Sequence, residues 1–82
     1  MDVNEIEKVI RGILAERVPG LKVEDIAPQA ELSSLGLDSL AFSWVLADLE
    51  EAFDIVMQGS DILHLKTLAA AVEYVAKRLE EA

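Results

Sequence analysis

Apolar residues recur at helical spacing in three parts of the chain, and segments rich in Pro, Gly and Ser separate them. The first pattern predicts an amphipathic helix from about residue 4 to residue 17. Asn4 or Asp2 is placed to cap its start, and Pro19 followed by Gly20 ends it. The residues expected on its buried face are Ile6, Val9, Ile10, Ile13, Leu14 and Val18.

Two further helices and one short turn follow in the second half of the chain. A helix is expected from Ser39 to about Phe53, with Leu40 covering the end of a buried stripe formed by Phe42, Val45, Leu46, Leu49 and Phe53. A short helical turn is expected near residues 61–65, capped by Ser60 or Asp61. The last helix is predicted to begin after Thr67 and to run to about Leu79, with one face formed by Leu68, Val72, Val75 and Leu79.

Residues 19–37 form a long connection between the first two helices. A loop of this length is uncommon in a compact domain unless it packs or functions. Its apolar residues indicate that it packs across the helices: Leu21, Val23, Ile26, Leu32 and Leu35. We therefore predict an all-α fold within one domain, residues 1–82. It is a small bundle of three longer helices and one short helix, with a long loop between the first and second helices.

Composition narrows the class of protein further. The chain has 82 residues, no cysteine and a formal charge of −9. Disulfides and thiolate metal sites are therefore excluded, and a surface of this sign would repel nucleic acid. There is no apolar run long enough for a bilayer and no signal-peptide pattern, so we expect a cytoplasmic monomer without membrane insertion.

The negative charge is concentrated in the middle of the sequence. No basic residue occurs between Lys22 and Lys66, and that window contains nine of the sixteen acidic residues. One interpretation is a solvated acidic face that keeps the protein in solution. The other is a docking surface for basic partners, because a field of one sign steers association.

The segment from Leu35 to Leu40, Leu-Gly-Leu-Asp-Ser-Leu, carries the candidate chemistry. Asp38 is a good N-cap residue because its carboxylate can accept hydrogen bonds from the first turn of the helix. Gly36 lets the incoming backbone bend. Ser39 then lies in the first turn, where an incoming enzyme can reach it. The sequence offers it no plausible base, so this serine is better placed to be modified than to act as a nucleophile.

In this setting the sequence resembles the acyl carrier protein family over essentially its whole length. The resemblance rests on three features: the motif ending Asp38-Ser39-Leu40, a helix ending Leu49-Glu50-Glu51-Ala52-Phe53-Asp54, and a last helix opening Thr67-Leu68. It implies a non-catalytic carrier. A phosphopantetheinyl transferase would attach 4'-phosphopantetheine to Ser39, next to Asp38 and Leu40, and the arm would hold cargo as a thioester. The thiol then comes with the cofactor, which explains the absence of cysteine.

The resemblance also implies partners and a docking surface. The partners are the transferase and the enzymes that load acyl or aminoacyl groups or transfer them. The residues expected to contact them are Leu37, Trp44, Asp48, Glu50 and Glu51. For Leu37, packing in the core is the alternative, and Asp38 can act both as a helix cap and at the transferase interface.

The chain departs from the family pattern soon after the motif serine. Many fatty-acid carriers have acidic residues early in this helix, where this chain has Ala41-Phe42-Ser43-Trp44. Trp44 either packs against the loop or a neighbouring helix, or is an exposed anchor for a specific partner. The departure favours a specialised stand-alone carrier, and the cargo stays open among fatty, polyketide-type and aminoacyl groups.

Two other classes of function remain for comparison. One is an interaction module that keeps the carrier fold but acts as a partner subunit without cargo. The other is an enzyme, which is disfavoured because no catalytic set can be assembled and no metal site is expected. His64 is the single histidine and is interpreted as a structural or surface residue.

Overall fold

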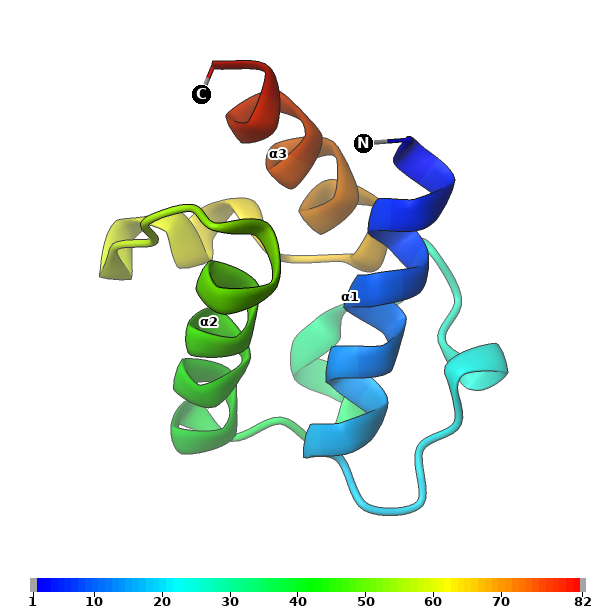
Figure 1. The fold of residues 1–82 in the computed structure, drawn as a ribbon. Coiled ribbons are helices and arrows are strands. Elements are labelled where there is room, and N and C mark those ends of the chain that lie inside the picture. The colour runs from blue at the N-terminus through cyan, green and yellow to red at the C-terminus, as the bar shows by residue number, and fades with distance from the viewer. Residues whose placement is uncertain (1, 82) are drawn as a thin grey trace.

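Three helices pack together around an aliphatic core in the computed structural model, which describes residues 2–81. They are α1 (Val3–Arg17), α2 (Ser39–Phe53) and α3 (Leu68–Glu81). Helix α1 packs against both α2 and α3 and thereby links the other two helices (Figure 1). The predicted all-α fold with a long loop after the first helix is confirmed.

Helix α1 forms where the sequence pattern places it. Its face toward the core buries Ile6, Ile10, Ile13 and Leu14, and Val18 is buried just beyond the helix. Of the two candidate caps, Asp2 is the one used, since its carboxylate accepts the N–H of Asn4 at 3.1 Å. The chain then turns at Gly20, whose φ of 83° is a left-handed conformation that favours glycine.

The connection between α1 and α2 is ordered and packs on the bundle. It contains two short 3-10 turns that the periodicity did not predict, η1 (Val23–Asp25) and η2 (Leu32–Leu35). Ile26 and Leu32 are buried in the core, which stabilises the fold by about 1.5–3 kcal/mol for each side chain. Val23 was expected to pack, but it is 42% exposed, since η1 buries none of its residues.

Hydrogen bonds from two directions hold this connection in place. The Arg11 guanidinium of α1 donates to the carbonyl oxygens of Val23 and Ile26, at 2.7 and 2.5 Å. On the other side, the N–H of Leu32 donates to the Lys66 carbonyl at 2.8 Å, and the N–H of Ala69 donates to the Pro28 carbonyl at 2.9 Å. The loop is thereby fixed to both α1 and the start of α3.

Helix α2 buries Val45, Leu49 and Phe53, while Phe42 and Leu46 are half-buried. The expectation that Leu40 covers the end of this stripe is wrong, because its side chain is 66% exposed. The helix ends at Asp54, which has a left-handed φ of 54°. The chain then returns to the core through Ile55 and Met57.

The short turn before α3 is the 3-10 helix η3 (Gly59–His64), which begins two residues earlier than predicted. Its N-cap is Gln58 and not Ser60 or Asp61 as expected; Asp61, three residues further on, accepts the N–H of Gln58 at 2.7 Å. Thr67 starts α3, where its hydroxyl accepts the N–H of Ala70 at 3.0 Å. Helix α3 extends to Glu81, two residues beyond the predicted end, and buries Leu68, Ala71, Val72 and Val75.

Between residues 2 and 81 there is no helix long and apolar enough to cross a membrane. The same residues contain no group of three or more His, Asp or Glu side chains that would hold a metal ion.

Candidate functional site

Ser39 is the first residue of α2 and is exposed to solvent. Asp38 is the N-cap, as the sequence predicted. Its carboxylate accepts the N–H of Ala41 at 2.7 Å, and its carbonyl accepts the N–H of Phe42 at 2.9 Å. The first N–H groups of a helix have no partner inside the helix. Those of Ser39 and Leu40 are therefore the two that a ligand at the helix start can use.

The turn before Ser39 is built by Gly36 and Leu37. Gly36 has a φ of 99°, and a Cβ at this position would lie 3.6 Å from Cγ1 of Val18. Leu37 is only 8% exposed and belongs to the core cluster. The expected docking role of Leu37 is therefore corrected: its side chain anchors the turn under Ser39, because the left-handed glycine directs the chain into the core.

Trp44 is 51% exposed, and the guanidinium of Arg17 lies over its ring. The Arg17 guanidinium carbon lies 5.5 Å from the ring centroid. The same guanidinium makes two hydrogen bonds to Asp48, from Nε at 2.7 Å and from Nη2 at 2.9 Å. These hydrogen bonds lower the pKa of Asp48 and raise the pKa of Arg17, so both groups are charged at neutral pH.

The three acidic residues expected to dock partners differ in their contacts within the fold. Asp48 is paired with Arg17, and the Glu50 carboxylate accepts the N–H of Met57 at 3.1 Å, which holds the segment after α2. Glu51 is exposed on α2. Of the three, Glu51 is therefore the one whose charge is most available to a partner, while Asp48 and Glu50 also stabilise the fold.

A hollow of about 300 Å³ lies near the start of α2. Phe42 lines it from the turn after Ser39, and Ile62, Leu65 and Lys66 line it from the opposite side. The remaining lining residues, Glu31 and Ser33, come from the connection between α1 and α2. The hollow is thus an apolar recess with polar edges, within one helical turn of the serine.

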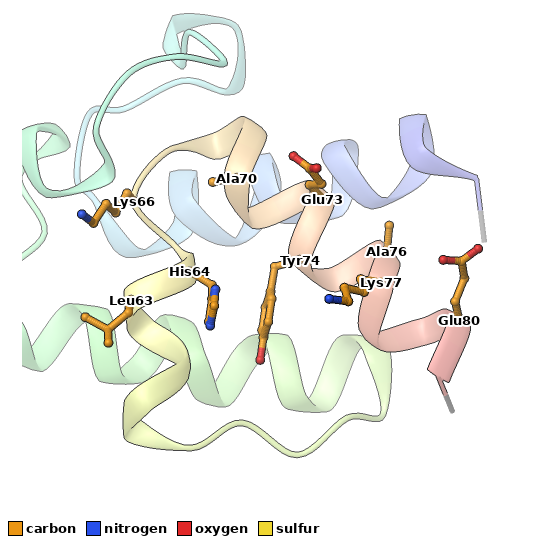
Figure 2. A pocket seen from close by; sticks show the side chains of 9 residues that line it. All are labelled: Leu63, His64, Lys66, Ala70, Glu73, Tyr74, Ala76, Lys77 and Glu80. Atoms are coloured by element: carbon orange, nitrogen blue, oxygen red, sulfur yellow. The ribbon is translucent and has the colours of Figure 1, made fainter.

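A larger open groove of about 670 Å³ runs along α3 and the end of η3 (Figure 2). The rings of His64 and Tyr74 stack there, with centroids 4.5 Å apart and planes within 2°. Lys77 and Glu80 lie further along the same helix (Figure 2). His64 is a surface residue, as expected, and its ring contact is an aromatic stack.

The sequence interpretation missed two groups that shape this surface. Arg17 is 31 residues from Asp48, and Tyr74 is 13 residues from Asp61, to which its hydroxyl donates a hydrogen bond. Contacts at such separations follow from how the helices pack. No pattern within a single helix predicts them.

Fold and site together define a helical carrier domain that presents a serine at a helix start. A family model described as a phosphopantetheine attachment site matches residues 8–75. The chain therefore belongs to the phosphopantetheine-binding acyl carrier protein family. Its members are non-catalytic carriers, and the family implies a covalent 4'-phosphopantetheine.

The chain is similar to the acyl carrier protein of Desulforapulum autotrophicum, with 38% identity over 74 residues, which cover 89% of this chain and 96% of that protein. It is also 31% identical to a region of the non-reducing polyketide synthase dbaI of Emericella nidulans. That match covers 95% of this chain and 3% of the synthase.

Two solved structures share the fold. Both contain a carrier protein from Agrobacterium tumefaciens bound to an engineered glycine:[carrier protein] ligase from Bradyrhizobium japonicum, one with ATP and one with AMP. The first matches with a TM-score of 0.75 and 30% identity, covering 88% of this chain and 97% of that chain. The second matches with a TM-score of 0.72 and 31% identity, covering 87% of this chain and 97% of that chain.

Proposed function

We propose that Ser39 carries the 4'-phosphopantetheine arm, and that the arm holds a small acyl group, of the aminoacyl type, as a thioester. The observation that carries the proposal is the exposed Ser39 at the first position of a helix capped by Asp38. The arm supplies the thiol that forms the thioester. The protein supplies the anchor and the surface on which partner enzymes dock.

The start of α2 fits the phosphate of the arm. A phosphodiester on the Ser39 hydroxyl would lie beside the N–H groups of Ser39 and Leu40, at the positive end of the helix dipole. The carboxylate of Asp38 already accepts the N–H of Ala41, so it is held as a cap. The surroundings of Ser39 therefore favour modification by a separate enzyme that brings its own base.

In that modification, the Ser39 oxygen forms a new bond to the phosphorus that bears the pantetheine in coenzyme A. The pyrophosphate bond of coenzyme A breaks, and the nucleotide part leaves. The proton of the hydroxyl passes to the transferase. Asp38 and Leu40 flank the reacting oxygen, and we include both in the surface that the transferase contacts.

One observation supports an aminoacyl cargo, and the recess beside Phe42, of about 300 Å³, has room for such a group. The two similar solved structures each contain a carrier protein in complex with a glycine-loading ligase. We therefore favour aminoacyl cargo over fatty or polyketide-type cargo, and we expect an aminoacyl-loading enzyme among the partners.

The test begins with the intact mass of the protein before and after incubation with coenzyme A, Mg²⁺ and a broad-specificity phosphopantetheinyl transferase. We expect one phosphopantetheine on the parent protein and none on Ser39→Ala. Ser43→Ala is the matched control, because Ser43 is exposed on the same helix and should leave the modification unchanged.

The second stage tests the cargo. The modified protein is incubated with ATP, the Bradyrhizobium ligase and glycine, and in parallel with a fatty-acid loading enzyme and a long-chain acid. Mass addition of glycine alone supports aminoacyl cargo, whereas loading of the long chain alone contradicts it. If several transferases leave the parent unmodified, the chain is better described as an interaction module without cargo.

A further inference from the structure

Four residues form a continuous exposed stripe along α2: Leu40, Trp44, Ala47 and Glu51. Their spacing of three or four positions places them on one face of the helix, over a length of about 16 Å. Leu40 is 66% exposed and Trp44 is 51% exposed. The stripe begins next to Ser39, so an enzyme that docks along it has access to the arm.

Trp44, in the apolar part of this stripe, is contacted by a residue of another helix. Arg17 is the last residue of α1, and its two hydrogen bonds to Asp48 fix the guanidinium beside the ring of Trp44. A cation over an indole face contributes about 0.5–1 kcal/mol at an exposed site. This arrangement restricts the rotamers of Trp44 while it leaves the other parts of the ring exposed.

The charge around the stripe indicates what kind of surface would cover it. Helix α2 contains no basic residue, and the positive charge of Arg17 is balanced by Asp48. Asp38 is exposed at its start, and Glu51 and Asp54 are exposed near its end. The complementary surface is therefore an apolar cleft for the leucine and the indole, with Lys or Arg side chains at its rim.

We propose that Trp44 is the anchor by which the enzyme that loads the arm recognises this chain, and that Arg17 is a positioning residue for that anchor. The enzyme contributes the apolar cleft and its basic rim. The proposal rests on the proposed carrier function, because the loading enzyme acts on the arm. Tryptophan and arginine are the residue types most often found at such interface hot spots.

The partner experiment uses the phosphopantetheinylated protein and the Bradyrhizobium ligase, with glycine and ATP. We measure KM for the carrier and kcat for glycine loading. Trp44→Ala should raise KM by at least about tenfold. Arg17→Ala should raise it by about two- to fivefold, with kcat unchanged. Val56→Ala is the matched control, because Val56 is 69% exposed but lies outside the stripe.

A second readout needs no partner. Trp44 is the single tryptophan, so its fluorescence reports on this site alone. Arg17→Ala should increase the nanosecond mobility of the indole in time-resolved anisotropy, while the urea midpoint of unfolding falls only slightly, because an ion pair near the surface contributes little stability. Arg17→Lys keeps a cation but loses the two-pronged contact with Asp48, and should give intermediate mobility and an intermediate KM.

Several results would overturn the proposal. One is an unchanged KM for Trp44→Ala, and another is an indole of the same mobility in Arg17→Ala and the parent. No saturable loading of the parent by the ligase would also overturn it. In that last case, the mass of the modified protein shows whether the arm is attached, so failure of the docking proposal is distinguished from failure of the carrier function.

Discussion

The hydroxyl of Tyr74 donates a hydrogen bond to the carboxylate of Asp61, and this contact joins α3 to η3. Arg78 reinforces it by donating to the Tyr74 oxygen at 3.2 Å and to the Val56 carbonyl at 2.6 Å. One cluster of side chains therefore fixes α3, η3 and the segment after α2 to one another.

The first prediction concerns the titration of Tyr74. The hydrogen bond to Asp61, followed by burial, raises the pKa of Tyr74 above its usual value of 10.0. Tyr74 is the single tyrosine, so the absorbance of tyrosinate follows it directly. Asp61→Asn should lower the Tyr74 pKa toward 10.0. A Tyr74 titration that is the same in the variant and the parent would show that the contact does not hold in solution.

The second prediction concerns acid unfolding. Hydrogen bonds from the Gln58 N–H and the Tyr74 hydroxyl lower the pKa of Asp61, and those from Arg17 lower the pKa of Asp48, each from the ordinary 3.8. A carboxylate whose pKa is lower in the folded state stabilises the fold at any pH above its pKa in the unfolded chain. That stability is lost as the pH falls through the pKa of the folded state.

We therefore expect the urea midpoint of the parent to fall once the pH drops below about 4. Asp61→Asn should show a shallower fall over the same range, because the neutral amide has no proton to take up. Tyr74→Phe removes one hydrogen-bond donor to Asp61 and keeps the carboxylate. Its urea midpoint should therefore fall with pH less steeply than that of the parent and more steeply than that of Asp61→Asn. Identical slopes for all three proteins would contradict the assignment.

The third prediction compares two glycines. Gly36 has a left-handed φ of 99°, so Gly36→Ala should destabilise the fold by about 1–2 kcal/mol. Gly12 lies inside α1, and a Cβ there would meet nothing within 4 Å. Gly12→Ala should therefore stabilise the fold by up to about 1 kcal/mol. Urea unfolding measures both changes in stability, and two changes of the same sign would contradict the backbone conformations assigned to the two glycines.

The fourth prediction separates the two roles of Asp38. Asp38→Ala removes the cap of α2 and should cost about 1 kcal/mol of stability, whereas Asp38→Asn keeps a good cap and should cost little. Both variants lose the negative charge next to Ser39. If the transferase recognises that charge, both should be modified slowly, as measured by intact mass over time. Normal modification of the asparagine variant would leave Asp38 with the capping role alone.

The local features of the fold follow closely from the sequence. Helical spacing of apolar residues identifies α1, α2 and α3, and Asp38 is predicted as the cap of α2 because its side chain acts on its own backbone neighbours. The 3-10 turns η1 and η2 are not predicted, since three or four residues are too few to show a period. The prediction for Leu40 is wrong because a residue in the first turn of a helix can face either the core or solvent at nearly the same spacing.

Which acidic residues of α2 are available to a partner could be determined only from the tertiary structure. Asp48, Glu50 and Glu51 look alike in the sequence, yet one is paired with Arg17, one holds the Met57 N–H, and one is exposed. The partners of the first two residues come from outside α2. A charge pattern along one helix cannot specify contacts made by another segment.

The sequence by itself determined the class of protein: three helices, a long packed loop, and a capped helix start with Ser39 in its first turn. Those features depend on interactions between residues close together in the chain. The tertiary structure decided that Leu37 is buried under the turn, that Trp44 is half-exposed, and that the guanidinium of Arg17 lies over its ring. These depend on the packing of α1 against α2, where residues distant in sequence meet across the interface.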